Sequence, residues 1–287
     1  MNMHWQNLVE QNYYIHYIKI FPKSSMTTQK KFIYDPVKEA NKQCHLLELY
    51  NILPTLRKDI RDHLEHFNHT QEDIIYLILA IMDLCQFRVG HTKYKNSTGI
   101  STLKRGQLNS CPSSTTSCSS IVFNGKRQVV NHCEILSEKI NDMLMSLSDY
   151  KDDDDFLFTY TDLYGNQQRV TADHINELLH RYGEITTKMF RTWKANYYFI
   201  KNIKSLPIPT SRSGIKKNIS SAVTITAEKL YHTKAICRRS YIDSRIVKLY
   251  ESSPQSFVDS LQSSRQATNP FLLSGEDDVI RLLEPIC

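Results

Sequence analysis

The longest apolar run of the chain extends from Ile74 to Cys85 and is interrupted by Tyr76 and Asp83. A helix that crosses a bilayer needs about 18 or more consecutive apolar residues, so this run is too short to span a membrane. Thr70 precedes the run and can cap a helix over residues 71–86. The run therefore predicts a helix of a soluble protein.

The length and the charge of the chain narrow its class only partly. A chain of 287 residues predicts one large catalytic domain with a small appendage. Its 36 Lys and Arg against 30 Asp and Glu give a net charge of +6, which suits nucleic acid but is shared by many ordinary enzymes. The start, residues 1–5, lacks the pattern of a signal peptide, so we expect an intracellular protein that is not secreted.

The cysteines give no metal-binding pattern. There are seven, an odd number, and no two of them form a Cys-x-x-Cys pair. Reduced thiols and the absence of a structural zinc are therefore expected.

The periodicity predicts more helix than strand. Aromatic and basic residues alternate in 13–21 and 30–34, which indicates β structure, and residues 99–104 are predicted as a short strand. Residues 109–120 are predicted as a mobile surface loop. Helices are expected over 37–53, ending at Pro54, over 56–67, from the Thr171 cap to Tyr182, over 186–203, over 215–230 and in an amphipathic tail from Ser256.

Two loops carry local signals. Asn124-Gly125 stands between apolar runs and favours a two-residue hairpin turn with positive φ at both positions, so Lys126 would emerge just past the turn. The run Asp149–Asp155 is predicted to be a native acidic surface loop; an inserted epitope tag is the alternative, because the run matches one.

The segment that ends at Tyr241 carries the clearest chemical signal. Tyr241 follows His232 by nine residues and comes directly after two arginines. A phenol held among cations and an imidazole can attack phosphorus as a nucleophile. Arginine is suited to clamp the phosphate oxygens, and the candidates are Arg88 and Arg191.

The ordered set of motifs resembles the type IB DNA topoisomerases of the small viral, poxvirus-like class. It comprises Phe87-Arg88 with Lys93-Tyr94, the segment Gly99–Leu103, Asn124-Gly125-Lys126, Phe156-Leu157-Phe158, Lys188-x-x-Arg191 with Asn196, and His232 to Tyr241. The resemblance implies an α+β fold, in which residues 36–287 form a mainly helical catalytic domain of the tyrosine-recombinase and topoisomerase IB type. This domain would contain a small β-sheet and a lysine-bearing hairpin. Residues 1–35 would be a shortened, β-rich segment that contacts DNA.

The same resemblance implies a role for each matching residue. Tyr241 would attack the phosphodiester and hold a 3′-phosphotyrosyl adduct. Arg88, Arg191 and His232 would bind the non-bridging oxygens, and Lys126 would protonate the leaving 5′ oxygen. Lys188 would support this cluster from the same helix face as Arg191. The family needs neither metal nor ATP, so the resemblance implies no cofactor, double-stranded DNA as partner and action as a monomer.

Further residues are expected to contact DNA. They are Tyr14, His16, His91, Lys93, Tyr94, Thr102, Asn196 and Lys201. Relative to the poxvirus pattern this sequence is expected to lack most of the N-terminal domain, either because the clamp around DNA is incomplete or because the sequence begins late, and it carries His91 in place of a lysine. Tyr231 and Lys234 replace a glycine and a proline. The nucleus, a cytoplasmic viral factory and a virion are all possible locations.

Two other functions stay open. Tyrosine recombinases share the fold and most of these residues, but usually place histidine where this chain has Lys188. A non-catalytic DNA-binding relic would explain the shortened N-terminus and the altered neighbours of His232. Since every expected catalytic side chain is present, the topoisomerase is the preferred interpretation.

Overall fold

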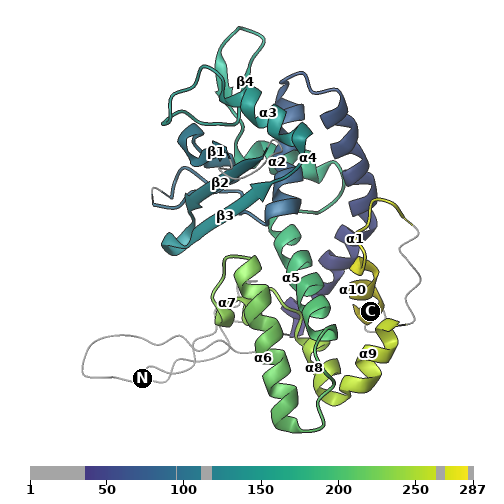
Figure 1. Cartoon of the computed structure of the whole chain (residues 1–287). Coiled ribbons are helices and arrows are strands. Elements are labelled where there is room, and N and C mark those ends of the chain that lie inside the picture. The colour runs from purple at the N-terminus through teal and green to yellow at the C-terminus, as the bar shows by residue number, and fades with distance from the viewer. Residues whose placement is uncertain (1–35, 95, 111–117, 263–268, 284–287) are drawn as a thin grey trace, which may run out of the picture. The chain divides into compact units, whose positions relative to one another are not determined.

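The computed structural model describes residues 36–94, 96–110, 118–262 and 269–283. The chain divides into two compact units, Met1–Asn41 and Lys42–Cys287. The described part is mainly helical with small antiparallel sheets (Figure 1). The predicted β structure of residues 1–35, with Tyr14 and His16, lies outside it.

The elements follow one another in this order: α1 (Pro36–Glu65), α2 (Gln71–Cys85), the 3₁₀ turns η2 (Ile100–Thr102) and η3 (Arg105–Gln107), β1 (Leu108–Ser110), β2 (Ser119–Asn124), η4 (Lys126–Gln128), β3 (Val130–Ile135), α3 (Glu138–Ser148), β4 (Thr159–Thr161), β5 (Gln167–Arg169), α4 (Ala172–His180), α5 (Thr187–Lys204), α6 (Arg212–Lys229), α7 (Lys234–Ser240), α8 (Ser244–Ser252), α9 (Pro254–Gln262) and α10 (Glu276–Leu283).

The helix α2 is buried almost along its whole length. Every residue from Asp73 to Met82 is buried, and each large apolar side chain contributes about 1.5–3 kcal/mol on burial. The predicted cap is confirmed, since the Thr70 side chain accepts from the Asp73 amide and the Asp73 carboxylate accepts from the Thr70 amide. Among the described helices, none is long and apolar enough to cross a bilayer.

The helix α1 runs through Pro54, where the sequence predicted a break. Proline removes one helical hydrogen bond and disfavours a helix interior. Here Leu49, Leu53 and Leu56 lie on the buried face on both sides of it and are fully enclosed. The packing of this face therefore outweighs the local preference of proline.

The hairpin of β2 and β3 is confirmed, but its turn differs from the prediction. The strands pair up to Asn124 and Val130, and Gly125 N–H donates to the Val129 carbonyl at 2.8 Å. Positive φ occurs at Arg127 (63°) and Gln128 (59°), not at Gly125. A larger residue at Gly125 would displace the side chain of Asn131, because a Cβ there would lie 2.4 Å from the Asn131 side-chain nitrogen.

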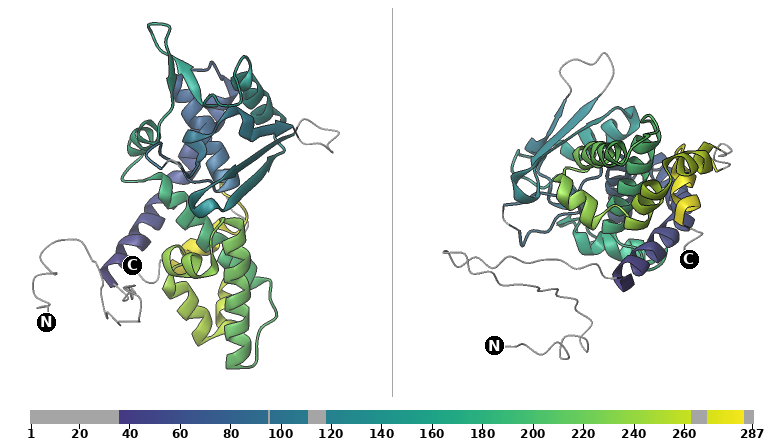
Figure 2. Two further views of the ribbon diagram at one scale, coloured as in Figure 1. Left: turned by 90° about the vertical axis from the view of Figure 1, so that its left-hand side faces the viewer. Right: turned by 90° about the horizontal axis from the view of Figure 1, so that it is seen from below.

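The helices that follow begin close to the predicted positions. Thr171 caps α4, and α5 matches the predicted helix to within a residue at each end. The helix α6 begins earlier than expected, because the Ser211 hydroxyl caps it by accepting from the Gly214 amide at 3.1 Å. The helices α5 and α6 lie side by side (Figures 1 and 2), and the predicted amphipathic tail forms α9 and α10.

The cysteines differ from the expectation of reduced thiols. Cys85, at the end of α2, and Cys133, on β3, form a disulfide with a Cα–Cα distance of 5.7 Å. These cysteines are 48 residues apart, so no spacing motif announces the pair. The disulfide joins the helix that leads to Arg88 to the hairpin that carries Lys126.

A buried network of four charged residues joins α1, α2, α5 and α10. Arg57 contacts Asp83 at 2.9 Å and Glu276 at 2.6 Å, and Lys194 contacts the same two carboxylates at 3.0 and 3.5 Å. The Trp193 indole donates to Glu276 at 3.0 Å. Burial alone would raise the pKa of the Glu276 carboxyl, but Arg57 and Lys194 hold it below its usual value. The network is therefore charge-balanced and ionised.

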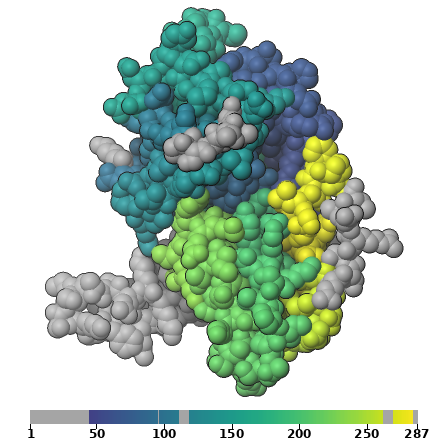
Figure 3. Space-filling model, in the orientation of Figure 1, coloured from purple at the N-terminus to yellow at the C-terminus, as the bar shows by residue number. Residues whose placement is uncertain are grey.

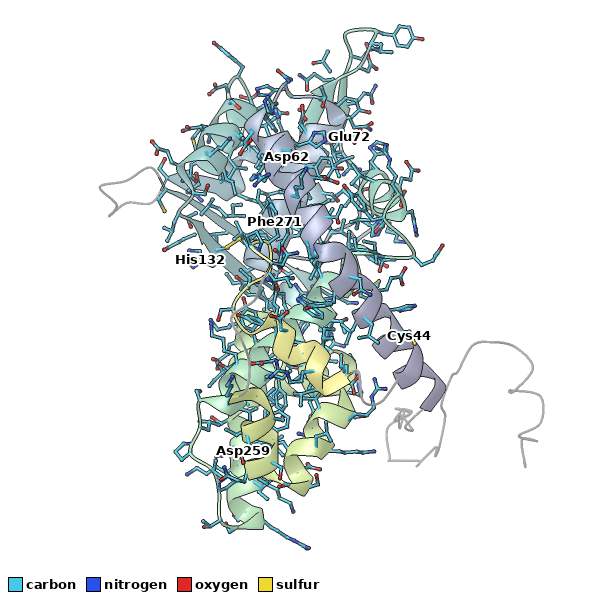
Figure 4. The ribbon with its side chains drawn as sticks, turned by 90° about the vertical axis from the view of Figure 1, so that its right-hand side faces the viewer. Cys44, Asp62, Glu72, His132, Asp259 and Phe271 are labelled. Carbon is cyan, nitrogen blue, oxygen red and sulfur yellow. A yellow bond between two sulfur atoms is a disulfide. The ribbon has the colours of Figure 1, made fainter. Side chains whose placement is uncertain are left out.

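Replacing Glu276 by alanine tests this network. The substitution leaves Arg57 and Lys194 with one carboxylate between them in a buried place, so the free energy of unfolding should fall by about 3–5 kcal/mol. Urea denaturation measures it. The control is Asp62→Ala on α1, whose exposed carboxylate pairs with Lys58 at 2.7 Å and which is labelled in Figure 4. Equal losses in the two variants would contradict the role of Glu276.

Candidate active site

Arg191 lies at the centre of the site. It is carried by the second turn of α5 and is only 3% exposed. Its guanidinium donates to the carbonyls of Gln86 and Leu230 and, at 2.7 Å, to Nε2 of His232. One side chain thus connects the end of α2, the end of α6 and the segment that leads to Tyr241.

The charge on Arg191 is not balanced by an acid. Burial and the nearby charge of Arg88 lower the pKa of the guanidinium to about 10, partly offset by the Tyr241 phenol. Within the described part of the chain, its hydrogen-bond partners are carbonyls, an imidazole and the Tyr241 phenol, with no carboxylate among them. A desolvated cation beside a second cation favours the binding of an anion.

His232 and Tyr241 stack against each other beside this arginine. Their ring centroids are 4.2 Å apart at an interplanar angle of 30°, and the Arg191 Cζ lies 6.0 Å from the centre of the Tyr241 ring. Burial, Arg191 and Arg88 together lower the pKa of His232 to about 3. The imidazole is therefore neutral, and since Nε2 accepts from Arg191, the proton belongs on Nδ1.

Two buried donors in this cluster have no partner in the described part of the protein. They are Nε of Arg191 and Nδ1 of His232. Buried polar groups are normally paired, so unpaired donors indicate a place for an absent acceptor. An oxyanion with several oxygens fits that place.

Asn196 fixes the backbone of Tyr241. It lies on α5, is fully buried, and donates to the Tyr241 carbonyl at 3.1 Å while accepting from the Asp243 amide at 2.8 Å. The sequence predicted a DNA contact for Asn196. Its side chain has no exposed surface and supports the tyrosine, so α5 positions both the arginine and the candidate nucleophile, while the DNA contact stays a prediction.

The Arg88 backbone is held by two glycines in contact. A Cβ on Gly99 would lie 2.5 Å from Gly90, and the amide of Ile100 donates to the Arg88 carbonyl at 2.8 Å. The predicted strand over 99–104 is wrong, since the structure has a 3₁₀ turn, η2, at Ile100–Thr102. The backbone here bonds to the irregular segment around Arg88 and not to a strand. Arg88 itself is half-buried.

Lys126 and Lys188 are both exposed. Lys126 lies within the hairpin turn, which is anchored by the Gln128 side chain on the Asn96 carbonyl at 2.6 Å. Lys188 precedes Arg191 by three residues, but its side chain is solvent-exposed where Arg191 is buried. None of the described contacts joins either ammonium group to Tyr241 or His232.

The other predicted DNA contacts lie in different surroundings. His91, Lys93 and Tyr94 cluster on the surface, with the His91 and Tyr94 rings 6.3 Å apart and the Lys93 ammonium 5.4 Å from the Tyr94 ring. Thr102 accepts from the Gly99 amide at 3.0 Å, so its hydroxyl caps a turn. Lys201 is exposed and lies 5.6 Å from the Tyr197 ring. Tyr14 and His16 are outside the described residues.

The acidic run 149–155 is exposed, as expected of a surface loop, and it contacts a basic segment. Asp154 pairs with Lys104 at 2.6 Å and Asp153 with Arg105 at 2.7 Å. The Arg105 amide also donates to the Asp155 carbonyl at 2.9 Å. Lys104 is thus already paired with a carboxylate of the same chain.

Some site groups had no sequence signal. The carbonyls of Gln86 and Leu230 hold Arg191, and any residue type supplies a carbonyl. Tyr231 donates from its hydroxyl to the His132 carbonyl on β3. The only hint of it in the sequence is that a tyrosine stands where the resembling family has glycine.

The lowered pKa of His232 predicts a pH-dependent stability. The pKa is about 3 in the folded protein against 6.5 for an ordinary imidazole, so the unfolded chain binds more protons between these values. The stability that the neutral His232 contributes to the folded protein is therefore fully present above pH 6.5 and is lost as the pH falls. Relative to His232→Gln, the wild type should lose roughly 2 kcal/mol of unfolding free energy between about pH 7.5 and about pH 5. Denaturation of both proteins at both pH values measures it, and a pH-independent difference would contradict it.

Comparison with known proteins gives the same family throughout. Residues 28–266 match the family model described as "Eukaryotic DNA topoisomerase I, catalytic core". The "DNA topoisomerase 1B" of Acanthamoeba polyphaga mimivirus is 30% identical over 232 residues, which are 77% of this chain and 68% of that protein. The "DNA topoisomerase 1" of rabbit fibroma virus is 27% identical over 70% of this chain and 61% of its own length. The vaccinia virus "DNA topoisomerase 1B" is 24% identical over 84% and 74%.

The matched range includes every residue of the site described above. Arg88, Lys126, Arg191, His232 and Tyr241 all lie between residues 28 and 266. Their order along the chain, the buried arginine beside the stacked histidine and tyrosine, and the match to the family model agree with one another. The chain belongs to the type IB DNA topoisomerases.

Proposed function

We propose that this protein relaxes supercoiled DNA by cutting and resealing one strand through a phosphotyrosine at Tyr241. The observation that carries this proposal is a pair of buried donors, Nε of Arg191 and Nδ1 of His232, which have no partner among the described residues and lie next to the Tyr241 ring. A phosphodiester supplies oxygen acceptors and a negative charge, which are the two features that this cluster lacks.

The chemistry follows from the position of these groups. The Tyr241 hydroxyl gives up its proton to water as its oxygen forms a bond to phosphorus, the bond from phosphorus to the 5′ oxygen breaks, and the DNA is held as a 3′-phosphotyrosyl adduct. Arg88, Arg191 and His232 stabilise the charge on the non-bridging oxygens. Because the phosphotyrosine conserves the energy of the broken bond, the 5′-hydroxyl can reverse the step without ATP.

Lys126 is proposed as the general acid that protonates the leaving 5′ oxygen. Its exposure on the hairpin turn leaves the ammonium group free to approach a bound strand. An alkoxide is a poor leaving group, so a positioned proton donor accelerates this step strongly. Lys188 is exposed one turn from Arg191 and is assigned a supporting role in the charge around the DNA.

The surface cluster of His91, Lys93 and Tyr94 is proposed to contact duplex DNA. A cation beside exposed aromatic rings can reach both phosphates and bases. We propose the same contact with duplex DNA for Lys201, Tyr14 and His16. Action as a monomer inside the cell, in a nucleus, a viral factory or a virion, belongs to the same proposal.

Relaxation of a supercoiled plasmid tests the function. The wild type should give a ladder of topoisomers without ATP or magnesium. Tyr241→Phe should abolish both relaxation and the covalent protein–DNA adduct, because the nucleophilic oxygen is removed while the ring still stacks on His232. The control is Tyr250→Phe, which removes the hydroxyl of another buried tyrosine, one that accepts from Asn218 at 3.0 Å. If the Tyr241→Phe variant still relaxed the plasmid, Tyr241 could not be the nucleophile.

The same experiment separates the rival functions. Joining of two marked DNA sites with no ladder would favour a tyrosine recombinase. DNA binding without either reaction in the wild type would favour a non-catalytic relic.

A modified substrate tests Lys126. Lys126→Ala should slow cleavage of ordinary DNA roughly 100- to 1000-fold under single-turnover conditions. A 5′-phosphorothiolate substrate should react at nearly the wild-type rate, because a thiolate leaves without needing the acid. Arg127→Ala is the matched control, since Arg127 is an exposed cation of the same turn. Equal slowing of Lys126→Ala on both substrates would reject the general-acid role.

A further inference from the structure

Tyr231 has a backbone conformation that is unfavourable for its residue type. Its φ is 53°, in the left-handed region that glycine adopts freely and other residues adopt at a cost. The local hydrogen bonds, from the Tyr231 amide to the Glu228 carbonyl and from the His232 amide to the Ala227 carbonyl, involve only the backbone. They would form equally well with glycine. The tyrosine side chain must therefore contribute something that offsets this cost.

That side chain reaches the hairpin that carries Lys126. The Tyr231 hydroxyl donates to the carbonyl of His132 on β3; His132 is labelled in Figure 4. The sheet order is β1-β2-β3, so among the described strands β3 lies at the edge of the sheet and its outer carbonyls pair with no further strand. In the space-filling view the surfaces of α6 and α7 border the surface of the hairpin (Figure 3).

The Tyr231 ring adds a second contact with the same region. It lies 5.9 Å from the ring of Phe87, which in turn lies 4.8 Å from Phe123 on β2. Phe87 directly precedes Arg88. Tyr231 is thus packed between the segment of His232, the segment of Arg88 and the hairpin.

The anchored carbonyl is close to the turn. Strand β3 begins at Val130, so His132 is the third residue of the strand, and it pairs with Val122 of β2. With about 3.3 Å per residue, the anchor lies roughly 10 Å from the end of the turn. The ladder couples both strands, so a shift of His132 moves Lys126 as well.

We infer that Tyr231 is a positioning residue that holds the Lys126 hairpin against the site of His232 and Tyr241. Its hydroxyl sets where the general acid lies relative to the leaving oxygen. This inference rests on the proposed role of Lys126. Tyr231 should therefore affect the protonation of the leaving group by Lys126. It should not affect the attack by Tyr241.

The test is Tyr231→Phe, which keeps the ring and removes only the hydroxyl. Single-turnover cleavage of ordinary DNA should slow about five- to tenfold, the value of one hydrogen bond. Cleavage of the 5′-phosphorothiolate substrate should change less than about twofold, since that substrate does not need the acid. In a Lys126→Ala background, Tyr231→Phe should have no further effect on ordinary DNA.

Two controls separate positioning from folding. Tyr231→Gly removes the side chain and relieves the backbone, so it should stay folded by thermal denaturation and show the same selective slowing. Tyr250→Phe should change neither substrate. Equal slowing of Tyr231→Phe on both substrates, or no slowing on ordinary DNA, would overturn the inference while the selective effect of Lys126→Ala leaves the proposed function standing. If Lys126→Ala itself is not selective, the general acid and the inference both fail.

Discussion

The structure depends on how α5 is held, because this helix carries both Arg191 and Asn196. On one side, Lys194 and Trp193 contact Asp83 and Glu276 in the buried charge network. Two cations and two carboxylates in a desolvated place tolerate little displacement, since every shift separates a charge from its partner. The helix α5, which orients the site residues, is therefore held in place by a charge network that contains none of those residues.

The site shows the opposite electrostatics from the network. Arg57 and Lys194 are matched by carboxylates, whereas Arg191 is held by carbonyls and a neutral imidazole. Among the described residues, this buried cation is surrounded by neutral partners and contacts no carboxylate, an arrangement that favours the binding of an anion. Burial strengthens the attraction between this guanidinium and an anion, and the carbonyls of Gln86 and Leu230 fix the orientation of the guanidinium.

The sequence could predict the local features of this protein and the family to which it belongs, whereas the roles of the individual site residues stay predictions. Thr70 and Thr171 predicted the first residues of two helices correctly, because an N-cap depends only on a few adjacent residues. It could not predict the partners of Arg191, which are backbone carbonyls, or the pairing of Cys85 with Cys133, which depends on distant segments. Nor could it predict that the Asn196 amide is buried against the backbone of Tyr241 and Asp243, because burial is not encoded in a motif.

The disulfide has a topological consequence. It closes a covalent ring between Cys85 and Cys133, and this ring contains both Arg88 and Lys126. Cross-linking restricts how far two parts of a ring can separate. Arg88, the proposed phosphate clamp, and Lys126, the proposed acid, therefore lie in one covalently closed loop, whereas Tyr241 lies outside it.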